Sequence, residues 1–203
     1  MNEKSITTID LLRHGELKTK GLFCAKPDEP LSEKGIQNLL KATKNKKWDV
    51  VVSSPFERCR QFAIKFKTEN DAKLLTYDKA FQEMDFGRWV GISSQQLWAQ
   101  EPEKLSQLWQ APQDFVAPSG ESMQDFNNRI EQATNALVNT HKNQSILLVT
   151  HAGVIRSILS LALQLSPVSA LKFNIDYAQM IRLHYYPDGQ FSLQSSLPLQ
   201  ELN

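Results

Sequence analysis

Short, continuous apolar runs constrain the fold of this chain more than any other feature. Asp49–Ser53 (DVVVS) and Ser145–Thr150 (SILLVT) show no alternation of polar and apolar residues. Such runs are typical of parallel strands that are buried on both faces. A third candidate strand, Ile6–Leu12, ends at the polar Arg13-His14-Gly15. We therefore expect a sheet that is covered on both faces.

Helix-start signals separate these strands. Ser54-Pro55-Phe56-Glu57 combines a Ser N-cap, Pro at the first helical position and an early Glu. Strand and helix alternate along the chain, which predicts an α/β fold with a mostly parallel sheet. The remaining predicted elements are helices at Glu33–Lys44, Ser122 to about Val138 and Gly153–Gln164, a weaker strand at Lys73–Tyr77, and a hairpin of Met180–Tyr186 and Gln190–Gln194 around Pro-Asp-Gly.

One segment, Ile92–Pro118, fits no strand of this sheet. It contains two tryptophans and three prolines, and we interpret it as a helical insertion that caps the functional site. Trp98 and Trp109 either line a substrate pocket there or pack into the core. The length of 203 residues suits a single domain spanning 1–203 with this modest insertion.

Composition excludes several classes of protein. A net charge of +1 argues against general nucleic-acid binding, and two cysteines cannot build a disulfide framework or a four-cysteine zinc site. No apolar run approaches the roughly 18 residues of a membrane span. The N-terminal segment has no apolar stretch typical of a secretory signal. We expect a cytoplasmic protein, monomeric or homodimeric, that acts on a small molecule without a cofactor or metal.

Four segments of unusual composition follow the predicted strands. Ligands in such folds bind at the carboxyl ends of the strands. Two of the four histidines stand there, His14 beside Gly15 and His151 two residues before Gly153, and Gly15 is expected to let the backbone approach a ligand. The segments are Arg13-His14-Gly15-Glu16, Ser53–Arg58, Glu83–Trp89 and Thr150-His151-Ala152-Gly153.

These residue types suit phosphoryl transfer. Arginine forks bind phosphate oxygens bidentately, so Arg13 and Arg58 are candidate phosphate ligands, with His151 as a third donor if it is protonated. A neutral imidazole can attack phosphorus, and His14 is the candidate nucleophile. The leaving alkoxide needs a proton from a positioned acid, for which Glu83 is the candidate.

Taken together, the segments resemble the histidine phosphatase superfamily, which is also called phosphoglycerate mutase-like. The Arg-His-Gly-Glu, Ser-Ser-Pro-x-x-Arg, Glu-x-x-x-Gly-x-Trp and second-histidine segments follow one another in family order from about residue 6 to 160. The resemblance implies a three-layer α/β/α fold and a phosphorylated His14. It implies a phosphate pocket of Arg13, Arg58 and His151, and it makes Glu83 the proton donor that later activates water.

Within the superfamily, the sequence is most similar to the α-ribazole 5′-phosphate phosphatases of cobalamin biosynthesis. The stretches that carry this likeness are Gly21-Leu22-Phe23, Pro30–Gly35 and Pro118-x-Gly120-Glu121-Ser122. One departure concerns the pocket, because family members commonly have an Asn soon after Arg-His-Gly-Glu. Here Leu17-Lys18-Thr19-Lys20 follows, and Thr19 and Lys20 are the candidate replacements.

Four functions remain open at this point. The first is a phosphomonoesterase acting on α-ribazole 5′-phosphate. The second is a broad-specificity or sugar-phosphate phosphatase, for which Lys18, Lys20 and Lys26 would bind a second phosphate. A phosphoglycerate mutase is the third, although no segment for its extra basic contacts is visible. The fourth, a non-catalytic phospho-ligand binding module, is disfavoured because both His14 and Glu83 are present. Asp85 competes with Glu83 for the acid role.

Overall fold

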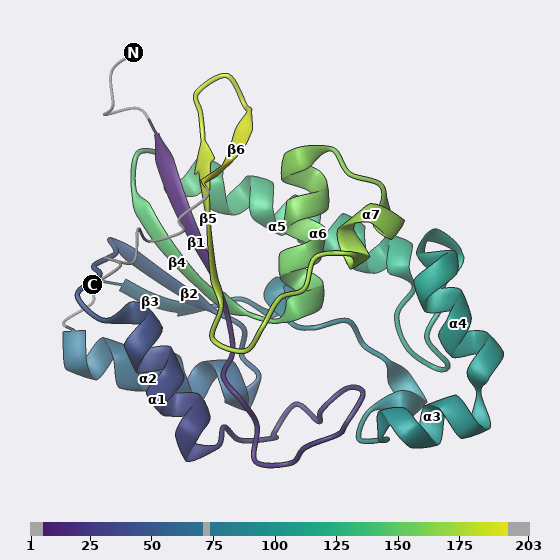
Figure 1. The fold of residues 1–203 in the computed structure, drawn as a ribbon. Helices are drawn as coiled ribbons and strands as arrows, with labels where there is room; N and C mark the ends of the chain where they lie inside the picture. The colour runs from purple at the N-terminus through teal and green to yellow at the C-terminus, as the bar shows by residue number, and fades with distance from the viewer. Residues whose placement is uncertain (1–5, 71–73, 195–203) are drawn as a thin grey trace, which may run out of the picture.

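A six-stranded sheet forms the centre of the molecule (Figure 1). The computed structural model describes residues 6–70 and 74–194. Within the sheet the strands lie in the order β3-β2-β4-β1-β5-β6. Their bounds are β1 Thr7–Arg13, β2 Val50–Ser53, β3 Leu74–Tyr77, β4 Ser145–Thr150, β5 Met180–Tyr185 and β6 Phe191–Gln194.

Strand direction follows the way in which the strands are connected. β1, β2, β3 and β4 pair in parallel, whereas β5 runs antiparallel to both β1 and β6. The helical connections produce the parallel pairs, and the tight turn at Pro187-Asp188-Gly189 produces the antiparallel β5–β6 hairpin. The predicted α/β fold with a mostly parallel sheet is confirmed.

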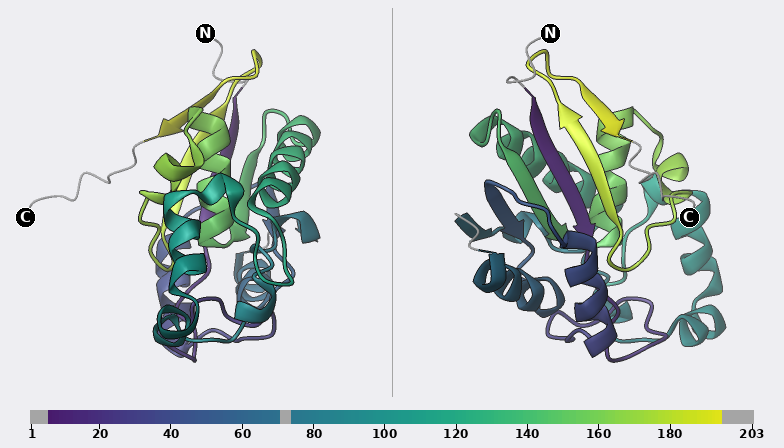
Figure 2. Two further views of the ribbon diagram at one scale, coloured as in Figure 1. Left: turned by 90° about the vertical axis from the view of Figure 1, so that its right-hand side faces the viewer. Right: turned by 60° about the vertical axis from the view of Figure 1, so that its left-hand side comes forward.

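Two hydrophobic cores lie on opposite faces of the sheet. Successive residues of β1 alternate between them: Ile9 and Leu11 join one core, and Leu12 joins the other. Helices α5 and α6 cover the first face, and α1 and α2 cover the second (Figures 1 and 2). The result is the three-layer α/β/α arrangement that the sequence resemblance implied.

The helices agree with the predicted pattern except at two places. Helix α2 begins at Glu57 rather than near Ser54, whose hydroxyl accepts from the Phe56 N–H at 3.4 Å and lies 2.8 Å from His151 Nε2. A short helix after α6 was not predicted. The helices are α1 Glu33–Thr43, α2 Glu57–Asn70, α3 Ser94–Gln100, α4 Pro102–Gln110, α5 Met123–Thr140, α6 Ala152–Leu163 and α7 Pro167–Leu171, with 3-10 turns at Lys79–Phe81, Gly87–Trp89 and Pro112–Asp114.

The insertion Ile92–Pro118 is helical, as predicted, and contains α3 and α4. Both helices lie apart from the sheet, and α3 lies beyond the carboxyl ends of the strands beside the loop that follows β1 (Figures 1 and 2). Isolated bridges from Leu22 to Ser93 and from Cys24 to Val90 join that loop to the insertion. The space between the insertion and α6 is where the candidate site lies.

Some sequence predictions fall outside the described residues. These are Lys73, predicted to begin the third strand, and the first five residues of the segment that was examined for a signal. In the part of the chain that is described, no helix combines the length and the apolar character needed to cross a membrane.

Candidate active site

Parallel pairing of β1 and β4 brings the two predicted histidines together. Arg13 and Thr150 are register partners at the strand ends, and the next residues in the chain are His14 and His151. The His14 backbone N–H donates to the Thr150 carbonyl at 2.9 Å. The imidazole rings lie edge to face with centroids 5.3 Å apart. Residues that are 137 positions apart in the chain therefore share one site.

The protonation state of His14 follows from one hydrogen bond. Its Nδ1 lies 2.9 Å from the Gly15 carbonyl oxygen, which can only accept, so Nδ1 carries the proton. Nε2 is left with its lone pair. Burial lowers the pKa of His14 well below its ordinary value, and the positive charges of Arg58 and Arg13 lower it further. The ring is therefore neutral at neutral pH.

His151 is fully buried and contacts the second arginine. Arg58 Nε donates to His151 Nδ1 at 3.3 Å, so the His151 proton resides on Nε2, which lies 2.8 Å from the Ser54 hydroxyl. Burial, followed by the charge of Arg58, lowers the pKa of His151 well below its ordinary value. Arg58 also donates from Nη1 to the Lys26 carbonyl at 2.9 Å. In this structure His151 is thus a neutral support for Arg58 rather than a charged donor.

Arg13 holds its guanidinium half-buried beside His14. Nη1 donates to the Ile175 carbonyl at 2.6 Å, and the guanidinium carbon lies 3.9 Å from the centre of the Tyr177 ring. Nε is buried, and no partner for it occurs among the described residues. A buried donor without a partner is rare and suggests a missing ligand. Sequence reasoning missed Tyr177, whose ring also lies 5.5 Å from that of His14.

Glu83 is held by backbone donors on either side. Its Oε1 accepts from the Met84 N–H and its Oε2 from the Gly153 N–H, each at 3.1 Å. A Cβ atom at Gly153 would overlap the Glu83 carboxylate, so a larger residue at this position in α6 would displace that carboxylate. The competing acid, Asp85, accepts from the Gly87 N–H at 2.9 Å and does not line the cavity that holds His14.

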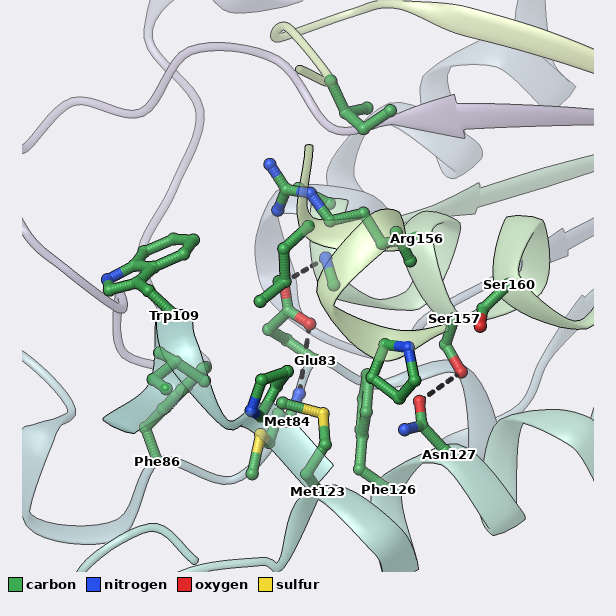
Figure 3. A pocket seen from close by; sticks show the side chains of 18 of the residues that line it. Glu83, Met84, Phe86, Trp109, Met123, Phe126, Asn127, Arg156, Ser157 and Ser160 are labelled. Carbon is green, nitrogen blue, oxygen red and sulfur yellow. Dashed lines mark hydrogen bonds between the residues drawn. The ribbon is translucent and has the colours of Figure 1, made fainter. Parts of the chain in front are cut away.

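Glu83 lines three cavities among the described residues, and two of these also have Arg13 in their walls. The smaller of these two, of about 90 Å³, is lined by Arg13, His14 and Arg58 as well as by Glu83. The larger, of about 260 Å³, has mostly apolar walls (Figure 3). Four residues line both cavities: Arg13, Phe23, Glu83 and Phe86. The smaller cavity has cationic walls and suits a phosphoryl group, whereas the larger suits an organic group attached to it.

The helical insertion contributes to the larger cavity. Trp109 of α4 lines it, whereas Trp98 of α3 does not and is 52% exposed. Of the two tryptophans singled out in the sequence, only Trp109 therefore belongs to the pocket. Leu108 of the insertion also lines it. Further walls come from three segments that the sequence pattern did not mark as functional, with side chains that include Met123, Phe126, Ala170, Leu171 and Ile175.

The loop that follows β1 contains Thr19 and Lys20, the two candidate replacements for the expected Asn, and also Gly15. Thr19 lines the cavity that holds His14, whereas Lys20 is exposed and pairs with Glu16 at 3.0 Å. Gly15 does not line that cavity. A Cβ there would collide with the backbone of Gly35 in α1, so loop–helix packing accounts for this glycine. The predicted role of Gly15 in ligand binding stays a prediction.

The cysteine that lines the smaller cavity is not a competing nucleophile. Cys24 lines the smaller cavity, but burial raises the pKa of its thiol to about 12, so the thiolate is scarcely populated at neutral pH. Groups of three or more His, Cys, Asp or Glu side chains able to hold a metal ion do not occur among the described residues.

Comparison with known proteins places the chain in a family. Residues 9–196 match the histidine phosphatase superfamily (branch 1), and the chain belongs to that superfamily. Relatives that the chain resembles include proteins named as phosphatases and as phosphoglycerate mutases.

Individual relatives are distant. The bifunctional protein Rv2228c of Mycobacterium tuberculosis is 26% identical over 93% of this chain, but the match spans only 53% of that protein. The adenosylcobalamin/alpha-ribazole phosphatase of Salmonella typhimurium is 28% identical, with 82% of this chain and 84% of the relative covered. The alpha-ribazole phosphatase structure from Shigella flexneri superposes with a TM-score of 0.79 at 25% identity, covering 92% and 94% of the two chains.

Proposed function

We propose that this protein is a metal-independent phosphomonoesterase that works through a phosphohistidine at His14. The observation that carries the proposal is the state of that side chain. Its Nδ1 proton is engaged by the Gly15 carbonyl, and the imidazole lines a cavity that Arg13 and Arg58 make cationic. A lone pair on Nε2 is therefore available where an anionic phosphoryl group would bind.

The phosphate would be bound chiefly by the two arginines. Arg13 has an unpartnered buried Nε, and Arg58 is 2% exposed and fixed by His151 and the Lys26 carbonyl. Fixed guanidinium groups stabilise the charge that spreads over the equatorial oxygens in the transition state. His151 supports Arg58 in this proposal, and its direct contact with phosphate stays a prediction.

Glu83 is proposed as the proton donor because it lines both the smaller and the larger cavity. Nε2 of His14 forms a bond to phosphorus as the ester P–O bond breaks, and protonated Glu83 gives its proton to the leaving oxygen. In the second step Glu83 takes a proton from water, the water oxygen bonds to phosphorus, and the P–N bond breaks. Both steps balance without an additional reactant.

For the substrate we propose α-ribazole 5′-phosphate, which would be hydrolysed to α-ribazole in assembly of the cobalamin nucleotide loop. Two observations support this choice. The larger cavity has apolar and aromatic walls, including Phe86, Trp109 and Phe126, that suit a flat base. The adenosylcobalamin/alpha-ribazole phosphatases of Escherichia coli and Salmonella typhimurium each align with 82% of this chain.

Bisphosphorylated substrates have less support from the site. Lys18, Lys20 and Lys26, the candidates for a second phosphate contact, do not line either of the two cavities. A broad-specificity phosphatase therefore remains the second candidate, ahead of a sugar-bisphosphate phosphatase or a mutase.

The test is phosphate release without added metal, with His14→Ala as control. The substrates are α-ribazole 5′-phosphate, 3-phosphoglycerate, fructose 2,6-bisphosphate and p-nitrophenyl phosphate. We expect a kcat/KM for α-ribazole 5′-phosphate about 100-fold above the others, which corresponds to about 2.7 kcal/mol of transition-state discrimination. Equal kcat/KM values on all four esters that disappear in His14→Ala would support the phosphohistidine mechanism and reject α-ribazole 5′-phosphate as the preferred substrate. Rates that persist in His14→Ala would reject the chemistry.

A further inference from the structure

The larger cavity contains one cation that the proposed chemistry does not use. Arg156 extends from α6 toward the part of the cavity where Trp109 and Glu83 lie (Figure 3). Its Nε donates to the Phe173 carbonyl at 3.0 Å, which fixes one edge of the guanidinium. Across the described residues, no acceptor bonds to its two terminal nitrogens, and no ion pair joins it to Glu83.

Most other polar side chains of this cavity already have partners. The Ser157 hydroxyl donates to Asn127 Oδ1 at 2.7 Å, and the Ser160 hydroxyl donates to the Leu165 carbonyl at 2.7 Å. Asn174 donates to Asp176 at 3.1 Å. The terminal nitrogens of Arg156 are therefore charged donors that remain available in this pocket, beside those of Arg13, which the proposed chemistry uses for the phosphoryl group.

Charge balance also favours a ligand at this position. Burial lowers the pKa of Arg156, and the carboxylate of Glu83 partly offsets that effect. In the proposed donor state Glu83 is neutral, so this offset disappears when the substrate is poised to react. An oxygen on the substrate would accept a hydrogen bond from these terminal nitrogens when the substrate fills the pocket.

The helix places Arg156 on the side of the cavity that Glu83 occupies. Gly153, which donates to Glu83, and Arg156 are three residues apart in α6 and hence lie on the same face of the helix. The group that meets Arg156 would therefore belong to the leaving alcohol, whose ester oxygen Glu83 protonates. The rest of the alcohol would pack against the apolar walls.

We infer that Arg156 is a specificity-determining residue that binds an acceptor oxygen on the leaving alcohol, either a carboxylate or a pair of ribose hydroxyls. This inference rests on the proposed phosphomonoesterase function. It defines the substrate class as phosphomonoesters whose alcohol combines an apolar portion with an oxygen acceptor. A planar guanidinium fork suits either source, because both present two oxygens side by side.

The experiment compares wild type, Arg156→Met, Arg156→Lys and the exposed control Arg88→Met. Phenyl phosphate is the reference ester because its alcohol has no second oxygen. One arm uses α-ribazole 5′-phosphate and its 2′,3′-dideoxy analogue, and the other uses 3-phosphoglycerate. Arg156 is expected to recognise either α-ribazole 5′-phosphate or 3-phosphoglycerate. For the ester that it recognises, Arg156→Met should lower kcat/KM at least tenfold more than it does for phenyl phosphate. Arg156→Lys should restore part of the difference, and Arg88→Met should leave it unchanged.

Two outcomes would overturn the inference. Equal losses on phenyl phosphate and on the oxygen-bearing esters would show that Arg156 only supports the Phe173 segment, and equal activity of Arg156→Met and wild type would show no role. If wild type hydrolyses none of the esters, the proposed function fails instead. Calorimetric titration of His14→Ala and His14→Ala/Arg156→Met with the same esters then decides the inference. A tenfold difference in Kd that is confined to oxygen-bearing esters supports it, and no difference rejects it.

Discussion

The hydrogen bond from His14 to the Gly15 carbonyl sets the chemistry at the scale of single residues. It fixes the proton on Nδ1, so the ring does not need to change tautomer before Nε2 attacks. Burial and the two neighbouring arginines keep the ring neutral. The charges that would bind phosphate thus also keep the nucleophile unprotonated.

This environment predicts the acid side of the pH profile. Because the pKa of His14 lies well below the ordinary value of 6.5, His14 should remain neutral and nucleophilic in mildly acidic solution. The profile of kcat/KM should be bell-shaped with a mildly acidic optimum. Steady-state rates from pH 4 to 9 provide the measurement. An acid limb with a midpoint at 6.5, or a profile that is flat throughout, would contradict the assignment.

Glu83→Gln should separate substrates by leaving group. Glutamine can occupy the same space but cannot donate a carboxylic proton, so alkyl phosphates should lose about 10²–10⁴-fold in kcat. Nitrophenolate leaves without a proton, and p-nitrophenyl phosphate should lose far less. Parallel kinetics on the two ester types provide the comparison, and equal losses would remove Glu83 from the acid role.

At the scale of elements, the first turn of α6 positions Glu83. The Gly153 N–H donates to Glu83 Oε2, and the missing Cβ leaves room for the carboxylate. Gly153→Ala should therefore displace Glu83 and lower kcat by at least about 100-fold on alkyl phosphates, which is the lower end of the effect of losing an acid. Alanine is the better helix former, so the melting temperature should change little. Full activity in this variant would show that Glu83 tolerates displacement, which contradicts the account.

Strands and helices were predictable where the residue pattern of a segment agrees with the place of that segment in the fold. The apolar run Ser145–Thr150 matches β4 at both ends because burial on both faces leaves no place for polar residues. The predicted start of α2 near Ser54 precedes the observed start at Glu57, and Ser54 also contacts His151, a partner 97 positions away. A helix-start pattern cannot reveal such a contact.

At the scale of the whole molecule, the proposed substrate pocket has walls that no single motif encodes. The residues proposed to bind phosphate lie in segments that follow strand ends, and the composition of these segments made them predictable. The larger cavity combines side chains of α4, α5, α6 and α7, such as Trp109, Phe126, Arg156 and Leu171. Each is an ordinary amphipathic or core position in its own helix. Their convergence depends on how the helices pack across the sheet.

Stability should depend on pH through the two buried histidines. The folded-state pKa values of His14 and His151 lie below the unfolded value near 6.5, so the unfolded chain binds protons first. Their stabilisation is complete above pH 6.5 and is lost as the pH falls toward the folded-state values, by up to about 1.4 kcal/mol per pH unit for each histidine.

Urea unfolding at pH 7.5, 6 and 5 measures this loss. His14→Asn replaces the Nδ1 donor with an amide that does not titrate. It should reduce the slope of the unfolding free energy against pH by an amount corresponding to up to one proton. The matched control is His141→Gln at the end of α5, which should keep the wild-type slope. An unchanged slope in His14→Asn would mean that His14 titrates alike in the folded and unfolded states.

The central claim is that the phosphoryl group passes through His14, and direct trapping of that intermediate tests it most directly. The protein is mixed with ³²P-labelled α-ribazole 5′-phosphate or p-nitrophenyl phosphate, quenched in alkali within milliseconds, and mapped by peptide mass spectrometry. The account predicts an acid-labile, alkali-stable label on the peptide that contains His14, with label absent from His14→Ala. Label on another residue, or rapid turnover with no label at any quench time, would contradict it.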